Sequence, residues 1–407
     1  MKRVVVTGFG SLSPLGHDWD SVSASLKSLR NVIRKMPEWA QYEGLNTRLG
    51  APVAPFALPA HYNRKTMRSM GRNAVMAVRA AELALEDSGL LGDPLLRSGR
   101  MGVSCGSSAG STKSMCDFGN MINNKTVEGI NATTYIKMMS HTAPVNIAVF
   151  FGMTGRVIPT SSACTSGSQG IGYAFEAIRS GAQVAMIAGG SEELCPTEAA
   201  VFDTLFATCL QNDTPELVPR PFDAKRDGLV LGEGAGMLVL EEYEHAKARG
   251  ATIHAELVGF GTNCDGTHVT HPNALTMAGA MRLALEQSGL AASAIGYVNG
   301  HGTATEQGDI AESEATASIF GRAVPFSTLK SYMGHTLGAC GALEAWMSIR
   351  MMNEGWFAPT LNLTEIDPRC GDLDYLRDAI RAVDTEHVMS NNFAFGGINT
   401  SLIFRRL

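Results

Sequence analysis

The sequence has few features of nucleic-acid-binding, secreted or membrane proteins. Its 33 lysines and arginines are outnumbered by 39 aspartates and glutamates, and the formal net charge of −6 disfavours nucleic-acid binding, which needs a basic surface. No stretch of about 18 apolar residues that could cross a bilayer is present. None of the eight cysteines forms a CxxC pair, and a chain of 407 residues is too long to depend on a disulfide framework. We therefore expect reduced thiols, a cytoplasmic location, no membrane span and no nucleic-acid partner.

Neither a leader peptide nor a flexible linker is predicted. In residues 1–10, MKRVVVTGFG, the apolar run is short and passes at once into a glycine-rich turn, without a small-residue cleavage site. This pattern indicates a first β-strand. No Pro/Ser-rich or charged segment divides the rest of the sequence. We therefore expect its parts to pack as one unit.

The sequence contains a weak internal repeat. Leu83–Leu90 reads LALEDSGL and Leu283–Leu290 reads LALEQSGL, and seven of these eight positions match. A second echo, VTGFG from Val6 and VGFG from Val258, precedes each copy. Together these matches favour an internal duplication. Strand-like and helix-like segments alternate in both halves, which predicts an α/β fold with mostly parallel, buried sheets.

We place the two halves at about 1–250 and 251–407. The first half carries an additional segment at roughly 111–150, which includes the Met- and Phe-rich run YIKMMSHTAPVNIAVFFG. An insertion of this kind would line a pocket or form a dimer contact.

Cys164 is the best candidate nucleophile. It lies in PTSSACTSGSQGIG, where VIP ends a strand and a helix begins near Ser166. A cysteine at that point has its sulfur close to the free N–H groups of the first helical turn, and the helix dipole favours the thiolate. The small neighbouring residues allow a sharp turn, as in other nucleophile elbows.

His301 and His335 are the candidate acid–base or hydrogen-bonding residues. His301 follows a strand over 296–299 in VNGHGTATEQGD, and His335 follows a strand in STLKSYMGHTLGACG. In the repeat, the His335 segment corresponds to the Cys164 segment, so strand ends from both halves should converge. Two imidazoles near a thiol would act as a general base or as donors to a developing oxyanion. Lys330 adds positive charge beside them.

Two further segments contain aromatic or histidine residues of interest. Phe393 and Phe395 lie in SNNFAFGGINTSLIF, which is equally compatible with an oxyanion-hole loop and with a plain hairpin turn. His268 and His271 in DGTHVTHPN have a spacing that metal ligands could adopt. No acidic or Cys cluster accompanies them, so we predict no metal site.

With these motifs in place, the chain resembles the β-ketoacyl-acyl-carrier-protein synthases of the elongating type, in the thiolase-like condensing-enzyme superfamily. The resemblance covers essentially the whole chain. It depends on ACTSG around Cys164, RPFDAKRDGLVLGEGAGMLVLEE over 220–242, NGHGTAT around His301, GH at His335 and NFAFGGIN near the end. It implies a thiolase-like fold with duplicated βαβαβαββ halves in an α-β-α-β-α arrangement.

The resemblance also implies roles for individual residues. The Cys–His–His triad of the family falls on Cys164, His301 and His335, and its lysine falls on Lys330. Phe395, with Phe393, falls on the gate of the family, and the backbone N–H of Phe395 would donate to the oxyanion hole. Thr303 and Thr305 fall on its pantetheine contacts. Glu344 and Asp309 fall on its supporting carboxylates.

The implied reaction is a ping-pong decarboxylative Claisen condensation, with the acyl thioester on Cys164 and malonyl-acyl-carrier protein as the extender. His301 and His335 would stabilise the enolate as CO2 leaves. No cofactor is implied. The expected partners are acyl- and malonyl-loaded carrier protein and a second subunit, either an identical copy or a related chain-length factor.

The carrier protein of this family is acidic, so a basic docking site is expected. Arg64, Arg68 and Arg72 in NRKTMRSMGR are spaced i, i+4 and i+8, which would place them on one face of a helix with Lys65 beside them. Charge complementarity of this kind speeds encounter. A solvated helix face is the alternative interpretation.

Several positions depart from the pattern of the family. Glu306 and Gln307 replace a proline and its neighbour, Tyr332 and Met333 alter the lysine loop, and Ala394 replaces a glycine that allows more backbone freedom. Ile398 replaces a threonine in the same C-terminal loop. We expect these changes to cluster around the substrate opening. They resemble variants that build specialised chains, such as the ketosynthases of aryl-polyene pigment pathways.

Three other functions fit the sequence less well. A chain-length-factor-like or malonyl-decarboxylating partner of another ketosynthase would commonly lack the cysteine, which is present here. A degradative thiolase would use a second cysteine near the C-terminus, but Cys370 lies outside any glycine-rich loop. An initiating synthase primed by coenzyme A would have Asn in place of His335.

Overall fold

An eleven-stranded mixed sheet runs through the protein, and the computed structural model describes all residues from 1 to 407. The strand order is β13-β11-β10-β15-β16-β9-β1-β8-β6-β4-β5. These strands are β1 (Val4–Leu12), β4 (Met101–Gly106), β5 (Val157–Pro159), β6 (Ala185–Glu192), β8 (Gly234–Glu242), β9 (Ala255–Cys264), β10 (Tyr297–Asn299), β11 (Pro325–Ser327), β13 (Asp374–Tyr375), β15 (His387–Ala394) and β16 (Ile398–Arg405).

Twelve α-helices and two small sheets surround it. The helices are α1 (Trp19–Lys27), α2 (Arg72–Ser88), α3 (Thr112–Asn124), α4 (Ala132–Met138), α5 (Thr142–Phe151), α6 (Ser166–Arg179), α7 (Pro196–Thr204), α8 (Tyr243–Ala248), α9 (Ala274–Ser288), α10 (Glu306–Phe320), α11 (Lys330–Met333) and α12 (Cys340–Glu354). The small sheets pair β12 (Trp356–Phe357) with β14 (Arg381–Ala382), and β3 (Leu49–Ala51) with β2 (Arg34–Lys35) and β7 (Leu231–Gly232).

The two halves of the large sheet have the same topology. In the first half, β1 pairs antiparallel with β8, β8 antiparallel with β6, and β6 and β5 each parallel with β4. In the second, β9 pairs antiparallel with β16, β16 antiparallel with β15, and β15 and β11 each parallel with β10. β1 and β9 join the halves antiparallel. The loops after β5 and β11 are therefore equivalent, as the repeat predicted.

The repeated motifs pack a helix closely on a strand in each half. A side chain at Gly10 would lie 1.9 Å from the Ala80 carbonyl oxygen on α2, and one at Gly261 would lie 2.0 Å from that of Ala280 on α9. Even the one mismatched position is equivalent, because Asp87 accepts a hydrogen bond from the Phe9 N–H at 2.9 Å and Gln287 accepts one from the Phe260 N–H at 2.7 Å.

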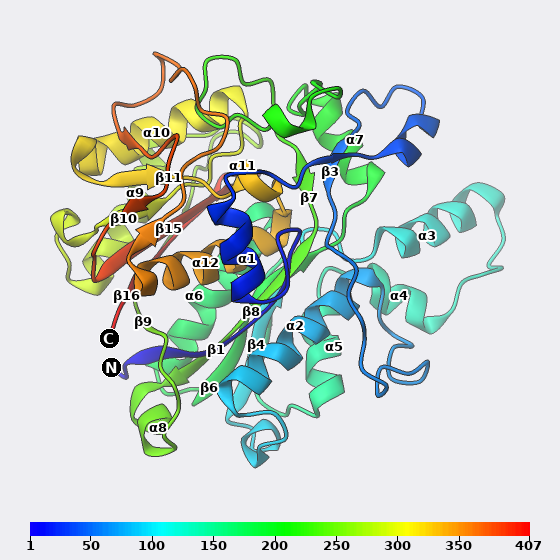
Figure 1. Ribbon diagram of the computed structural model, residues 1–407. Coiled ribbons are helices and arrows are strands. Elements are labelled where there is room, and N and C mark those ends of the chain that lie inside the picture. The colour runs from blue at the N-terminus through cyan, green and yellow to red at the C-terminus, as the bar shows by residue number, and fades with distance from the viewer.

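Five layers result from this duplication. α2 covers the outer face of the first half, α9 covers that of the second, and α6 and α12 lie between the two halves (Figure 1). The α-β-α-β-α arrangement expected from the resemblance is confirmed. The expected boundary near residue 250 falls between α8 and β9, and the division into two units there stays a prediction.

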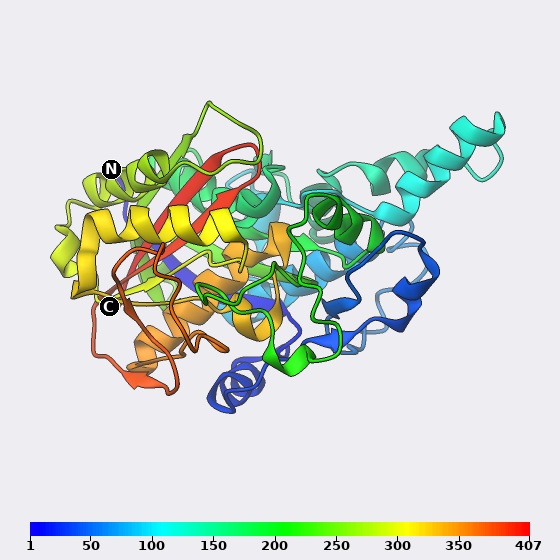
Figure 2. The same cartoon turned by 90° about the horizontal axis from the view of Figure 1, so that it is seen from above.

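The inserted segment forms α3, α4 and α5. α5 packs against α2 and β4, whereas α3 extends away from the rest of the molecule and is buried only near its first turn (Figure 2). Exposed apolar side chains occur along this segment, including Ile122 at 60% and Val127 at 75% exposure. No helix combines the length and the apolar character that spanning a membrane requires.

Candidate active site

Cys164 lies in a tight turn between β5 and α6. Ala163, although not a glycine, has a φ of +50°, and the turn continues as a short 3-10 helix over Ala163–Thr165 into α6. The Thr165 hydroxyl donates to the Ser162 carbonyl and the Ser166 hydroxyl to the Ala163 carbonyl, both at 2.7 Å. A backbone held in this uncommon region by local hydrogen bonds is a feature of functional turns. The predicted elbow is confirmed.

His335 contacts the sulfur directly. Its Nε2 lies 3.0 Å from Cys164 Sγ, and its Nδ1 accepts a hydrogen bond from the Leu337 N–H at 3.3 Å. Gly334, at a φ of +70°, lets the chain turn from α11 toward the site. Because Nδ1 is an acceptor, the neutral ring carries its proton on Nε2, so this N–H donates toward the sulfur.

His301 reaches the same point from the end of β10. Its ring centroid lies 5.0 Å from that of His335, with the rings perpendicular at 89°. Asn392 Nδ2 lies 3.4 Å from His301 Nδ1, which places the imidazole proton on Nε2 here too. Burial, the Lys330 ammonium and His335 together lower the pKa of His301 well below its usual value, and burial and Lys330 do the same for His335. Both rings are therefore neutral donors at pH 7.

Lys330 and Glu344 form a buried ion pair that Asn392 links to His301. The Lys330 ammonium donates to Glu344 Oε1, and the side chains are 1% and 0% exposed. Asn392 Nδ2 donates to the other oxygen at 2.8 Å, so one amide links Glu344 to His301. Although burial alone would lower the pKa of Lys330, the charges of Cys340 and Glu344 raise it. The site contains a permanent positive charge.

The expectation of a resting thiolate at Cys164 is wrong. Burial raises the pKa of this thiol to about 12, against the opposing effects of Lys330 and of the backbone N–H groups of Phe395 and Cys164. The turn does place the sulfur at the start of α6, but the residue is only 5% exposed. Removal from water outweighs the favourable dipole, since burial disfavours the charged form.

The C-terminal aromatic loop is both a hairpin turn and part of the site. β15 and β16 pair in a continuous register that ends at Ala394 and Ile398. The Phe395 ring packs at 5.3 Å from that of Phe202 on α7, and the Phe395 N–H faces Cys164 Sγ. The Phe393 ring lies edge-on to His301 at 6.2 Å. The two alternatives for this loop are therefore compatible with each other.

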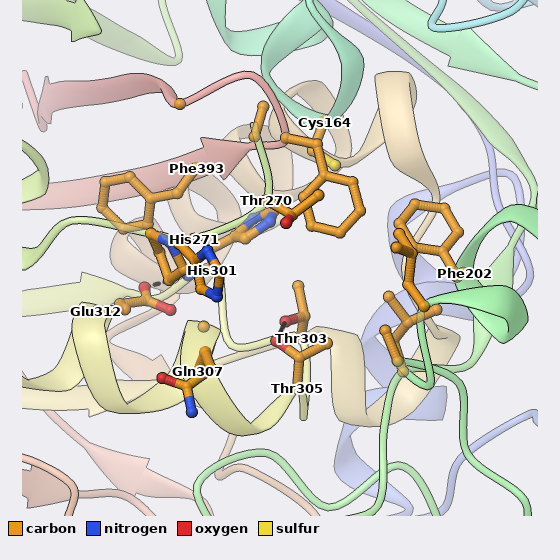
Figure 3. Close-up of a pocket in the computed structure, with 18 of the residues that line it drawn as sticks. Cys164, Phe202, Thr270, His271, His301, Thr303, Thr305, Gln307, Glu312 and Phe393 are labelled. Carbon is orange, nitrogen blue, oxygen red and sulfur yellow. Dashed lines mark hydrogen bonds between the residues drawn. The ribbon is translucent and has the colours of Figure 1, made fainter. Parts of the chain in front are cut away.

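A cavity of about 320 Å³ connects the surface to Cys164 (Figure 3). Thr303 and Thr305 lie on its wall, with their hydroxyls 2.9 Å apart. Figure 3 shows His301 and Glu312 on one side of the cavity and Phe202 on the other. The lining also includes His271, Glu306, Gln307 and Ala394.

Not all the departures from the family pattern lie at this opening. Glu306, Gln307 and Ala394 line the cavity, as expected. Tyr332 and Met333 do not, since both are fully buried in the central hydrophobic core, and their expected place at the opening is wrong. Bulky apolar side chains follow the demands of core packing wherever the loop bearing them is covered.

Carboxylates hold the loop that bears His301. Glu312 accepts the backbone N–H groups of His301 and Gly302, the latter at 2.7 Å. Asp309 accepts the Ala304 N–H at 3.1 Å and lies 3.4 Å from the Arg226 guanidinium. Burial raises the pKa of Glu312 to about 8 and that of Asp309 to about 6. Through these hydrogen bonds both carboxyl groups position the loop, and the supporting role that the resemblance implied for Asp309 stays a prediction.

The sequence reasoning missed several residues of the site. Glu312 has no motif that distinguishes it from a surface glutamate, although its place one helical turn after Asp309 puts both on one face of α10. Asn392 lies in SNNFAFGG, where the two phenylalanines are the more conspicuous residues, and its amide contacts His301 and Glu344. The spacing of His271 from His268 suggests only a metal ligand, but His271 lines the cavity, with its Nδ1 3.0 Å from that of His268.

Cys164, His301 and His335 are also the only three residues grouped closely enough to hold a metal ion. Their ligand atoms lie within 4.8 Å of one another. The charge of the Lys330 ammonium lowers the pKa of all three residues, and this fixed positive charge would repel a metal cation bound between them. The absence of a metal stays a prediction.

The helix proposed for the docking arginines is wrong. Residues 64–69 form turns, and α2 begins only at Arg72, where the side chain pairs with Glu233. Arg64, Arg68 and Arg72 nevertheless line one surface pocket, together with Lys137 from α4. Lys65 is exposed beside them. Because Gly71 is the cap residue of α2, Arg64 and Arg68 lie outside this helix, and the i, i+4, i+8 spacing does not place the arginines on one helix face. The folding of the chain as a whole brings the basic groups together.

Comparisons with known proteins match the whole chain. The β-ketoacyl synthase N-terminal domain family matches residues 1–246 and the corresponding C-terminal domain family matches residues 254–364. A 3-oxoacyl-[acyl-carrier-protein] synthase 2 of Vibrio cholerae is 37% identical, with 100% of this chain and 99% of that protein covered.

Solved structures agree with this match. A β-ketoacyl synthase from Burkholderia phymatum is 61% identical, with a TM-score of 0.99 and complete coverage of both chains. The ishigamide ketosynthase/chain length factor is 31% identical, with a TM-score of 0.90 over 100% of this chain and 99% of that chain.

Proposed function

The chain belongs to the β-ketoacyl synthase family of condensing acyltransferases, and we propose that it extends carrier-protein-bound acyl chains by decarboxylative condensation at Cys164. The observation that supports this most directly is the contact of His335 Nε2 with Cys164 Sγ at 3.0 Å, with His301 beside it. A nucleophile and two neutral hydrogen-bond donors then face one cavity.

In the first half-reaction, the Cys164 thiol attacks the acyl thioester of the carrier. A new carbon–sulfur bond forms to Cys164, the bond to the pantetheine sulfur breaks, and the thiol proton leaves with the pantetheine sulfur. The negative charge that develops on the thioester oxygen is stabilised by the backbone N–H groups of Cys164 and Phe395, which already face the sulfur. A thiol with its pKa raised to about 12 must lose its proton during this step.

In the second half-reaction, His301 and His335 bind the malonyl thioester. Both Nε2–H groups donate to the thioester carbonyl oxygen, so that the electron pair released with CO2 forms an enolate they stabilise. Neutral donors suit this step because their Nδ1 atoms already accept hydrogen bonds from Leu337 and Asn392. The Lys330 ammonium contributes electrostatically to the same charge.

Condensation follows within the same cavity. The enolate carbon attacks the acyl carbonyl on Cys164, the carbon–sulfur bond breaks, and the released sulfur takes up a proton. The product is the 3-oxoacyl-carrier protein, two carbons longer than the acyl group loaded on Cys164.

A cysteine comparison tests this proposal. Cys164→Ala should abolish formation of the 3-oxoacyl product from acyl- and malonyl-carrier protein, measured by intact mass of the carrier. Cys116→Ala, which alters an exposed thiol on α3, should keep full activity. Product formation by the Cys164→Ala variant would refute the assignment. Decarboxylation without acyl loading in the native protein would indicate a malonyl-decarboxylating partner of another ketosynthase.

The basic pocket beside α2 supports docking of an acidic carrier protein. Arg64 and Arg68 are exposed there, while the pairing of Arg72 with Glu233 leaves it less suited to the role. Arg68→Glu should raise KM for the carrier and leave kcat unchanged, and the effect should weaken with salt. Arg282→Glu, a reversal on the exposed side of α9, is the control.

An exposed sheet edge and the projecting insertion support a dimer. β5 is the last strand of the large sheet, and its Val157 is 40% exposed. Val149 on α5 is 74% exposed nearby in sequence. We propose that a second copy or a related chain-length factor covers this face. Analytical ultracentrifugation of the protein alone distinguishes these two partners. A dimer would indicate a second copy, and a monomer would indicate that a different protein covers this face.

The residues at the cavity opening that depart from the family pattern support a role in a specialised pathway. Glu306 and Gln307 replace a proline and its neighbour in the family pattern, and both line the cavity. We propose chains other than saturated fatty acids, with aryl-polyene precursors as the first candidates. A panel of acyl donors, followed by the mass added to Cys164, would identify the preferred chain.

A further inference from the structure

Glu198 is a buried carboxyl group on α7 that the mechanism above does not use. It is 8% exposed and lies on the inner face of α7 with Ala199 and Phe202. Ala199 and Phe202 belong to the hydrophobic cluster that contains Cys164. Because residues four apart share a helix face, Glu198 lies one turn from Phe202, whose ring lines the cavity.

Neither oxygen of the Glu198 carboxyl has a hydrogen-bond partner in the protein. Its acidic neighbours are well paired by contrast. Glu192 accepts hydrogen bonds from Ser107 and from the Ser108 N–H at 2.7 Å, Glu193 from Thr112 at 2.7 Å, and Glu233 from Arg72. A buried polar group without a partner is costly, and native structures contain few of them. Glu198 is therefore suited to a partner that the folded chain does not supply.

The surroundings keep this carboxyl neutral. Burial raises the pKa of Glu198 well above its usual value, and the charges of Glu192, Cys195 and Glu193 act in the same direction. Its position in the first turn of α7 opposes this effect, since a helix N-terminus favours a negative charge. A protonated carboxyl group offers one donor and one acceptor, so it can bind a hydroxyl or a carbonyl oxygen.

The location of Glu198 points to the acyl chain rather than to the pantetheine arm. Thr303 and Thr305 line the cavity from the loop before α10, whereas Phe202 of α7 forms a separate part of its wall, across from His301 and Glu312 (Figure 3). An acyl group on Cys164 has to extend away from the arm that delivered it. The side of Cys164 that α7 covers is therefore the one that this chain would meet.

We propose that Glu198 is a specificity-determining residue, whose carboxyl group hydrogen-bonds an oxygen-bearing group on the acyl chain that Cys164 carries. The ligand is an acyl thioester with a hydroxyl or carbonyl oxygen along its chain or at its end. This inference depends on the proposed condensing function and adds the chemical class of the substrate to it.

Matched acyl donors test the proposal. Carrier proteins loaded with ω-hydroxyacyl chains and with saturated chains of equal length, in short, medium and long sets, are incubated with the native protein, Glu198→Leu and Glu198→Gln. The rate of acyl transfer to Cys164 is followed by intact mass without malonyl-carrier protein. Glu244→Leu, an exposed change on α8, is the control for the substitution itself.

At one chain length, the native protein should load the hydroxylated chain at least about tenfold faster than the saturated chain, because a site built to bind an oxygen is left unpaired without it. Glu198→Leu should abolish or invert this ratio by also accelerating the saturated chain. Glu198→Gln should keep most of the ratio, since an amide also has a donor and an acceptor.

Two results would overturn the proposal: the same ratio in the native protein and Glu198→Leu at every length, or no preference for the hydroxylated chain in the native protein at any length. The second result does not depend on the folding of a variant. If the native protein transferred neither chain type to Cys164, the condensing function itself would fail, which is a distinct outcome.

Discussion

The buried ion pair between Lys330 and Glu344 allows a quantitative test of the site. The side chains are 1% and 0% exposed, so Glu344→Gln leaves an ammonium without its counter-charge in the interior. Removing one partner of a buried pair costs about 3–5 kcal/mol. The Asn392 amide can still donate to the new Gln oxygen, so that this hydrogen bond is kept. We therefore expect a loss of about 4 kcal/mol in the free energy of unfolding.

The expected loss converts into a measurable melting temperature. An unfolding entropy of about 2.1 cal/mol/K per residue gives about 0.9 kcal/mol/K for this chain. Glu344→Gln should therefore lower Tm by about 5 °C in differential scanning calorimetry. Asp372→Asn breaks the pair with Arg322, whose side chains are 75% and 68% exposed, and should change Tm by less than about 1 °C.

The double variant separates charge burial from side-chain loss. Lys330→Met removes the charge and keeps the length of the side chain. Lys330→Met/Glu344→Gln should be more stable than the sum of the single losses predicts, by more than about 1 kcal/mol, since no charge then stays buried. Additive losses, or a Glu344→Gln protein that melts within about 1 °C of the native protein, would refute this account of the pair.

Three further predictions concern activity. Burial and the Lys330 ammonium lower the pKa of His301 and His335, and only the neutral rings can accept at Nδ1 the hydrogen bonds from Asn392 and Leu337 that hold them in place, so activity is present above these pKa values. Lys330→Met should move the acidic limb of the pH profile of malonyl decarboxylation to higher pH, and an unmoved limb would contradict the assignment. Glu312→Ala removes both oxygens that accept the N–H groups of His301 and Gly302 and should lower kcat by about 10- to 100-fold in steady-state assays, whereas the exposed Glu314→Ala on the same helix should not. Phe395→Ala keeps the backbone N–H but removes the ring that packs on Phe202, so acyl-Cys164 should hydrolyse faster in a single-turnover mass assay; an unchanged rate would argue against a gate.

Local sequence patterns were reliable wherever the structure depends on neighbours in the chain. Gly10 and Gly261 stand where a helix backbone comes within reach of a strand, and Gly89 and Gly289 end α2 and α9 in the left-handed conformation. These packing constraints are the same in each half, so the duplication is detectable as sequence similarity between the halves. The equivalence of the Cys164 and His335 loops followed from it.

Patterns were unreliable where a residue's surroundings come from distant segments. The spacing of Arg64, Arg68 and Arg72 suited a helix, but the helix begins only at Arg72, and Lys137 from another helix completes the basic pocket. Tyr332 was expected at the cavity opening and lies in the core.

The sequence by itself determined the duplicated α/β topology, the turn that presents Cys164 and the loops that bring His301 and His335 to it. Turn-forming residues and hydrophobic periodicity act over a few neighbouring residues, so they can be recognised in the sequence. The tertiary structure alone decided the protonation of the site, because burial and the distant charge of Lys330 set the pKa values of Cys164 and both histidines. It also decided that the Glu198 carboxyl has no hydrogen-bond partner, because this depends on all the segments that pack around it and not on its neighbours in the sequence.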